Sequence, residues 1–253
     1  MRRYSNRRTQ RNNGPPFRER LGRWLRRFAV LGVVLVVAAG AWLVYESPLL
    51  RVASVSVTGA DNVDPAALAA ASGLKGQNIL TADTGKAKAH ISEMAMVKSV
   101  SIERHWPGRM VIKVEERQPW GYWQVKDQPY VIDDEGVVLD SGRPAEGAPT
   151  IVNVDSEQQY LPGESVDADA VALAKSLIES SPRALGRGVQ SLEYSDHSGL
   201  TAVFDGGLRA TFGDSRDLDY KLSVLYVLLQ RAQEQSFEVH AVDLRFGETV
   251  SFQ

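Results

Sequence analysis

The sequence predicts an α+β protein with a single N-terminal transmembrane helix. A small domain in the order strand, helix, helix, strand, strand follows, and then a larger mixed α/β domain with a mainly antiparallel sheet. Three observations predict this fold class: an uncharged, largely apolar run near the N-terminus, several segments that alternate apolar and polar residues, and runs with apolar residues at helical spacing.

The apolar run covers residues 28–45 and separates two regions of opposite charge. Residues 1–27 hold ten arginines and one acid, whereas the rest of the chain has a net charge of −11. With Trp24 and Leu25 the run reaches the roughly 20 residues that cross a bilayer. Since the arginines flank it on one side, the positive-inside rule predicts a cytoplasmic N-terminus and an exported segment 46–253.

Two other interpretations of this region are weaker. Ala39-Gly40-Ala41 resembles the cleavage site of a signal peptide, but the basic region is long and the apolar run continues past that site. The Arg-rich tail could bind nucleic acid, but a basic segment beside a membrane helix is more simply an orientation signal that contacts anionic lipid. The chain has no cysteine, which excludes disulfides and thiolate metal sites.

The small domain begins with alternating residues at 52–58, a strand that ends at Gly59. Asp64 followed by Pro65 predicts the start of a helix, and Gly73 its end. A second helix is predicted at about 84–95. The residues expected on its buried face are Ala87, Ile91 and Met94.

Two alternating segments, "VKSVSIER" and "RMVIKVEER", then predict a hairpin around the turn "HWPG". In the first, Val100 and Ile102 are expected to face the core, whereas the set Val97, Ser99, Ser101 and Glu103 faces the other way. In the second, the predicted inward row is Met110, Ile112 and Val114. The charges then lie on the solvated face, where Glu103 and Lys113 could pair. A catalytic role for His105 is the alternative, but the sequence offers it no partner nucleophile.

The sequence predicts that the larger domain is rich in β-strands. "PYVIDDEGVVLD" predicts a hairpin around residues 133–136, and this acidic turn lacks the twelve-residue pattern of a calcium loop. A helix is predicted at about 167–180 and a second at 215–234, the latter with a core-facing stripe of Leu218, Leu222, Leu225, Leu229 and Ala232. Predicted strands are 189–196, 199–205, 207–213, "EVHAVDLRF" and "TVSFQ".

The strand and helix order of the small domain resembles a POTRA domain, and "VKSVSIERHWPGRMVIKVEERQPWGYW" is similar to the FtsQ/DivIB family of bacterial cell-division proteins. "VASVSVTGA" fits the opening strand of that family and "VDLRF" its closing motif. Gly121 stands where the family usually has alanine. The matching motif positions are Val97, Val100, Ile102, Arg104, Trp106, Pro107, Glu116, Arg117, Pro119, Gly121 and Trp123. The resemblance covers about 28–253.

The resemblance implies a domain plan and a function. Residues 1–27 would be a cytoplasmic tail, 28–45 the transmembrane helix, 50–118 the POTRA domain and 119–253 the β domain. The protein would be a non-catalytic, single-pass scaffold in the cytoplasmic (inner) membrane at the division septum. It would bind FtsB, FtsL and other divisome membrane proteins and help recruit and regulate septal peptidoglycan synthesis, with no cofactor, metal, nucleic acid or small-molecule substrate.

Two other functions stay open. A POTRA component of protein export or outer-membrane assembly is the first, although such transporters need a long series of membrane strands. An enzyme that modifies the cell wall is the second. The four histidines are widely separated and no phosphate-binding loop or serine-nucleophile motif is present in the sequence.

The resemblance also implies where the partner binds. The last strand is expected at an edge of the sheet, where a segment of FtsB would add as a further strand. The residues expected to contact it are Arg245, Phe246, Gly247, Thr249, Val250, Ser251 and Phe252, with His197 placed by approximate alignment. The motif residues Arg104, Trp106, Pro107, Glu116, Pro119 and Trp123 are expected to be structural. The alternative is that Phe246 is a core residue and "TVSFQ" a frayed tail.

Overall fold

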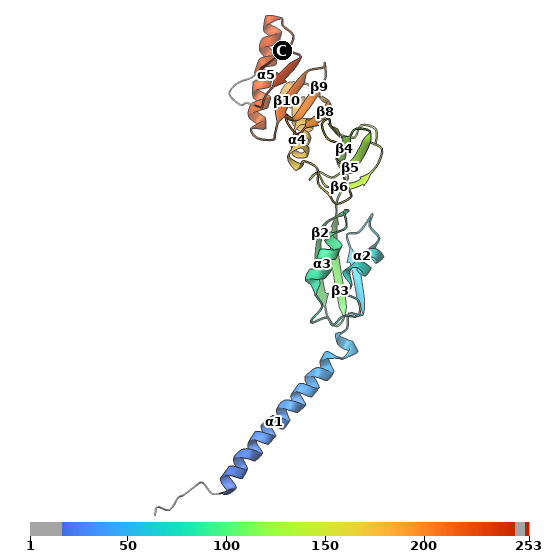
Figure 1. The fold of residues 1–253 in the computed structure, drawn as a ribbon, viewed down its shortest axis with the longest axis vertical. Helices are drawn as coiled ribbons and strands as arrows, with labels where there is room; N and C mark the ends of the chain where they lie inside the picture. Colours follow the sequence, from blue (N-terminus) through green and yellow to red (C-terminus); the bar gives the residue numbers. More distant parts are fainter. Residues whose placement is uncertain (1–16, 246–250, 253) are drawn as a thin grey trace, which may run out of the picture.

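The computed structural model describes residues 17–245 together with Ser251 and Phe252. A long helix leads into a small three-stranded unit, and a nine-stranded sheet follows beyond it (Figure 1). Helix α1 spans Phe17–Tyr45 and so begins upstream of the predicted 28–45. Its part Arg27–Tyr45 is long and apolar enough to cross a membrane, and none of that part is buried inside the protein.

The small unit has the predicted order of elements. They are β1 (Ser54–Thr58), α2 (Pro65–Ser72), α3 (Thr84–Ser92), β2 (Val97–His105) and β3 (Arg109–Glu116). The sheet order is β1-β3-β2, with β1 parallel and β2 antiparallel to the central β3. Both helices contribute to one apolar cluster with the sheet, through Leu68, Leu74, Ile79, Ala87, Ile91 and Ile112 among others.

The helix starts in this unit follow from their caps. The Asp64 carboxylate accepts a hydrogen bond from the backbone N–H of Ala66 (2.8 Å), and Gly73 closes α2 in the left-handed conformation. Asp83 caps α3 in the same way by accepting from the N–H of Lys86 (3.0 Å). Helix α3 ends at Ser92 rather than near 95, so Met94 packs against the core from outside the helix.

The hairpin confirms both predicted inward rows, with Val100 buried and Ile102 half-buried against the core, and corrects the placement of Val97. Met110, Ile112 and Val114 are buried as expected. Val97, predicted on the outer face, is buried together with Val100, because the register shifts between Val97 and Ser99 and the alternation is interrupted there. On the solvated face the predicted pair forms between the Lys113 Nζ and a Glu103 carboxylate oxygen, which lie 2.6 Å apart.

The larger sheet holds nine strands in the order β12-β11-β10-β9-β8-β7-β4-β5-β6. They are β4 (Gly121–Val125), β5 (Gln128–Ile132), β6 (Val138–Ser141), β7 (Thr150–Asn153), β8 (Val189–Ser195), β9 (Gly199–Phe204), β10 (Arg209–Gly213), β11 (Ala241–Asp243) and β12 (Ser251–Phe252). Most neighbours are antiparallel, but β7 runs parallel to both β4 and β8, and β11 runs parallel to β10. Strands β4 and β7 were not predicted.

Two helices pack against this sheet: α4 (Ala168–Leu185) and α5 (Leu218–Gln235). They contact each other, and α4 also contacts β8 and β9. The predicted stripe of α5 is confirmed as core, since Leu222, Leu225 and Ala232 are buried while Leu218 and Leu229 are half-buried against the same cluster. The two helices and the sheet thus share one apolar core.

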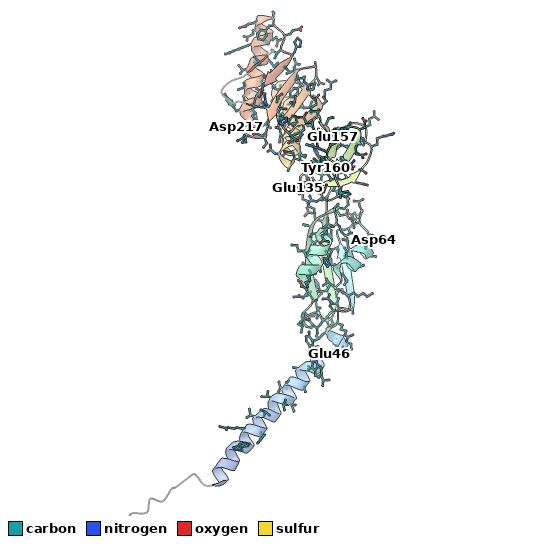
Figure 2. All side chains as sticks on the ribbon, in the orientation of Figure 1. Glu46, Asp64, Glu135, Glu157, Tyr160 and Asp217 are labelled. Atoms are coloured by element: carbon teal, nitrogen blue, oxygen red, sulfur yellow. The ribbon has the colours of Figure 1, made fainter. Side chains whose placement is uncertain are left out.

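A group of charged side chains joins the two units. Arg117, just after β3, lies with its Nη1 2.5 Å from Asp133 Oδ2 and 2.8 Å from Glu135 Oε2. Lys98 on β2 reaches Glu135 as well (3.1 Å). Figure 2 shows Glu135 at the junction between the units. Asp133 also accepts hydrogen bonds from the backbone N–H groups of Glu135 and Val137. The same aspartate therefore stabilises the hairpin turn and pairs with Arg117.

Candidate partner-binding edge of the larger sheet

One end of the nine-stranded sheet is formed by two very short strands. Strand β11 has three residues and pairs in parallel with β10. Strand β12 has two residues and pairs antiparallel with β11, with Val242 opposite Phe252 and Asp243 opposite Ser251. Within the described residues β12 is therefore the last strand, as predicted. The predicted Gly247-Glu248 turn lies outside them.

Strand β11 packs against the apolar core of the larger domain on one side. Val242 and Leu244 are buried, and the Leu244 N–H donates to Thr211 O on β10 (2.8 Å). The parallel arrangement of β10 and β11 requires a crossover, which α5 provides between them. The strand is shorter than "EVHAVDLRF" suggested, since pairing begins only at Ala241.

Arg245 follows β11 directly and is oriented by its neighbour. Its Nη2 lies 2.6 Å from Asp243 Oδ2, and its Nε donates to Oδ1 (3.0 Å). This pairing raises the pKa of Arg245 and lowers the pKa of the Asp243 carboxyl. Gly213 leaves room for the arginine, because a Cβ there would lie 3.0 Å from Arg245 Cγ. The guanidinium is thus held charged and in place beside the sheet end.

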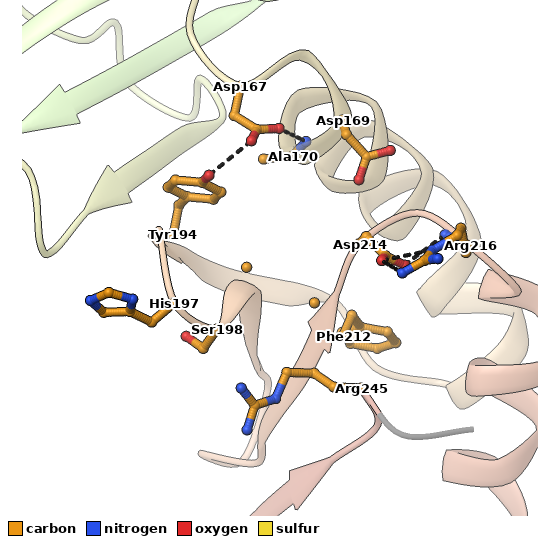
Figure 3. A pocket seen from close by; sticks show the side chains of 12 residues that line it. Asp167, Asp169, Ala170, Tyr194, His197, Ser198, Phe212, Asp214, Arg216 and Arg245 are labelled. Atoms are coloured by element: carbon orange, nitrogen blue, oxygen red, sulfur yellow. Dashed lines mark hydrogen bonds and ion pairs between the residues drawn. The ribbon is translucent and has the colours of Figure 1, made fainter. Parts of the chain in front are cut away.

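A pocket of about 380 Å³ brings Arg245 and His197 to one surface (Figure 3). His197 is exposed in the turn between β8 and β9, and Arg245 approaches from the segment that follows β11. The other lining residues include Asp167, Asp169, Tyr194, Phe212, Asp214 and Arg216. Both signs of charge line the cavity, so it suits polar or charged side chains of a partner better than apolar ones.

The acidic wall of the pocket is held by internal hydrogen bonds. Asp167 caps α4 by accepting from the Ala170 N–H (2.8 Å), and its other oxygen accepts from the Tyr194 hydroxyl (2.8 Å). Burial, together with this hydrogen bond, raises the pKa of Tyr194. The hydrogen bond from Arg216 lowers the pKa of Asp214 to about 2. The Asp214 carboxylate is therefore charged near neutral pH.

The remaining predicted contact residues are not tested. Phe246, Gly247, Thr249 and Val250 lie outside the described residues, and so does the alternative that Phe246 is core. Ser251 and Phe252 are described only by their backbone in β12.

The motif residues lie away from this edge. Glu116 and Trp123 are buried, Arg104 donates to Ala82 O (2.8 Å), and Trp106, Pro107 and Pro119 are exposed. Sequence reasoning missed the acidic wall of the pocket. One usable signal was Asp167, which stands at the start of the predicted helix 167–180, where an N-cap residue is expected; Tyr194 and Asp214 gave none.

Across residues 17–245, Ser251 and Phe252, no three or more His, Asp or Glu side chains are grouped so that they could hold a metal ion.

The architecture defines a class of protein: a POTRA-bearing chain with one membrane-length helix ahead of it. Residues 50–117 match the family model described as POTRA domain, FtsQ-type, and residues 121–245 match that of cell division protein FtsQ/DivIB, C-terminal. The chain belongs to the FtsQ/DivIB family of cell-division proteins.

Individual relatives agree with this assignment. The chain is 30% identical to cell division protein FtsQ of Chloroflexus aurantiacus over 85% of its own length and 80% of the relative's. It is 28% identical to the FtsQ of Corynebacterium glutamicum over 80% of its length and 89% of the relative's.

Proposed function

We propose that this chain is a membrane-anchored, non-catalytic scaffold of the divisome that binds FtsB and FtsL. Family membership supports a role in cell division. Helix α1 supports membrane anchoring, and the ten arginines before residue 28 support a cytoplasmic N-terminus and periplasmic domains. At the septum such a scaffold would help recruit and regulate peptidoglycan synthesis.

The observation that carries the binding proposal is the end strand β12. It is two residues long and stands last in the sheet order. The outer row of backbone N–H and C=O groups of such a strand can pair with an added strand of a partner. An FtsB segment that adds there would form main-chain hydrogen bonds, while Phe246 and Phe252 would supply apolar anchors.

The pocket beside the edge would contribute selectivity. Arg245 and His197 would meet acidic side chains of FtsB, and Asp167, Asp169 and Asp214 would favour a basic one. A partner segment with both signs of charge at the matching spacing is therefore expected. Exposed charge pairs of this kind act more on partner choice and association rate than on affinity.

Deletion of residues 249–253 tests the proposal on the full-length protein in detergent. The truncated chain should keep the thermal melt of its parent and lose capture of purified FtsB. Capture at the parent's level by the folded, truncated chain would rule out the edge. In a turnover assay on peptidoglycan the parent protein should show no activity, and measurable turnover would contradict a non-catalytic scaffold.

A further inference from the structure

Trp106 belongs to the family motif, yet its side chain is 61% exposed. It lies in the turn between β2 and β3. Gly108 of the same turn accepts hydrogen bonds through its carbonyl oxygen from the N–H groups of Ala53 (2.8 Å) and Ser54 (3.3 Å). The turn is therefore fixed against the beginning of β1, the end of the unit that directly follows helix α1. Core packing does not explain a tryptophan at this position.

Two exposed leucines lie at the same end of the unit. Leu49, in the short 3₁₀ helix Pro48–Leu50, is 74% exposed, and Leu80 is 52% exposed. The Ile79 N–H donates to Leu50 O (2.7 Å), which joins the segment of Leu80 to that short helix. Large apolar side chains thus emerge from three separate segments at one end of the unit.

Hydrogen bonds connect this end to helix α1. The Asn78 side-chain amide donates to Tyr45 O, the last residue of the helix (2.8 Å), and the Tyr45 and Thr81 hydroxyls are 3.3 Å apart. Arg104, another motif residue, donates to Ala82 O (2.8 Å) and so fixes β2, the strand that leads to Trp106, to the same segment. Figure 1 shows α1 meeting the three-stranded unit at this end.

The charges of this end also suit a lipid surface. Arg51 and Arg109 are exposed, and long arginine side chains can reach headgroups while their stems cover apolar surface. Of the nearby acids, Glu103 is paired with Lys113 (2.6 Å) and Asp83 caps α3. Glu46 is exposed.

We infer that this end of the small unit is a lipid-binding surface that rests on the headgroup region of the membrane crossed by α1. We define the surface by Leu49, Leu80 and Trp106, with Arg51 and Arg109 at its border. Tryptophan favours the membrane interface because its ring is amphipathic, and leucines next to it lose water-exposed apolar area on contact. The contact would limit how far the unit can tilt relative to the membrane. This inference rests on the proposed anchoring by α1.

Single-site labelling can test it, because the chain has no cysteine. Full-length variants His105→Cys, Asp61→Cys and Val36→Cys would each carry an environment-sensitive fluorophore in vesicles of phosphatidylethanolamine and phosphatidylglycerol. A second vesicle set would contain lipid with a nitroxide quencher close to the headgroup. His105 precedes Trp106, Asp61 follows β1 at its opposite end, and Val36 lies within α1.

Quenching is expected for the His105 label and not for the Asp61 label. In the His105→Cys background, Trp106→Ser and Leu80→Ser should each reduce quenching. Leu161→Ser, which changes a 68%-exposed leucine of the larger domain, should leave it unchanged. Equal melts would show that the variants are folded.

Two results would overturn the inference. If the His105 label is quenched no more than the Asp61 label, this end of the unit does not contact lipid. If quenching is unchanged in both serine variants, the side chains of Trp106 and Leu80 do not form the contact. The Val36 label separates this inference from the anchoring proposal. If it is protected from water while the His105 label is not, only the surface contact fails; if Val36 is also fully accessible to water, anchoring fails too.

Discussion

Arg117 and Asp133 form an ion pair that joins the small unit to the larger sheet. The Arg117 Nη1 lies 2.5 Å from Asp133 Oδ2, and the Asp133 side chain is only 2% exposed. Partial burial acts to lower the pKa of Arg117, but its hydrogen bonds with Glu135 and Asp133 outweigh burial and raise it. The motif arginine therefore has a structural role at the junction.

Arg117→Met should destabilise the protein by about 1–3 kcal/mol, because the buried Asp133 carboxylate loses its cationic partner. The free energy of unfolding from denaturant titration measures this. Lys126→Met is the matched control, since its pair with Glu157 is exposed on both sides and adds little. Equal effects of the two substitutions would contradict the role of the junction pair.

Glu116 should stabilise the small unit in a pH-dependent way. Its buried carboxylate accepts backbone N–H groups of Asp61 (2.9 Å), Asn62 (3.0 Å) and Val63 (2.8 Å). Burial alone would raise its pKa, but these hydrogen bonds outweigh burial and lower it from the ordinary 4.5. Because the unfolded chain then binds the proton more readily, the stabilisation is complete above pH 4.5 and is lost as the pH falls through the folded-state pKa.

Glu116→Gln should therefore cost about 1–3 kcal/mol near neutral pH, since an amide cannot accept all these donors. The difference from the parent should shrink as the pH falls below 4.5. Glu115→Gln, at the exposed neighbour, is the control and should change little. A difference for Glu116→Gln that does not vary with pH would argue against a charged Glu116 as the source of stability.

Gly121→Ala should destabilise the larger domain. A Cβ at this position would lie 2.7 Å from Pro149 O, the carbonyl that accepts the Tyr122 N–H. Displacing it disturbs the start of the β4–β7 pairing, at a cost of about 1–3 kcal/mol. Gly142→Ala is the control, because its nearest atom would be 3.7 Å away. Equal melting temperatures for both variants would show that the sheet adapts.

Two substitutions in the β2–β3 hairpin should have opposite outcomes. Ile112→Asp should unfold the small unit, because it puts a charge in a fully buried position. His105→Ala should leave stability within about 0.5 kcal/mol and division activity intact, since His105 is exposed beside the turn. Complementation of a division-defective strain, with a thermal melt, measures both. Loss of activity in a fully stable His105→Ala protein would revive a catalytic role.

Membrane orientation can be tested with reporters. A reporter active only outside the cytoplasm should work when fused after Gln253, and replacement of the ten N-terminal arginines by acids should weaken or invert this result. Activity of a cytoplasmic reporter at that position in the parent would reverse the proposed topology.

Much of the fold could be predicted because its signals are local. The caps at Asp64 and Gly73 and the alternation through Met110, Ile112 and Val114 act within a few residues. Strands β4 and β7 were missed because they are short and their pairing depends on partners distant in the chain. The Val97 error has a similar origin, since a bulge is a property of the paired strands.

The candidate site was predictable only in part. The resemblance directed attention to Arg245 and His197, which the fold brings to one pocket. Asp167 could be recognised as a helix cap, but its meeting with Asp214 in one acidic wall could not, because the wall assembles from the start of α4 and the residue after β10, which are distant in the chain. The role of Arg117 likewise depends on Asp133, a residue of the other sheet's hairpin.

The central claim, that FtsB adds to the sheet at β12, is tested most directly by proline substitution at opposite edges of one sheet. Val250→Pro removes a backbone donor next to β12. Ser141→Pro does so in β6, the strand at the other end of the sheet order, where the Ser141 N–H donates to the side chain of Asp140 (2.7 Å). When both full-length variants are folded, Val250→Pro should lose FtsB capture and Ser141→Pro should capture FtsB normally. Normal capture by folded Val250→Pro would rule out addition of FtsB at β12.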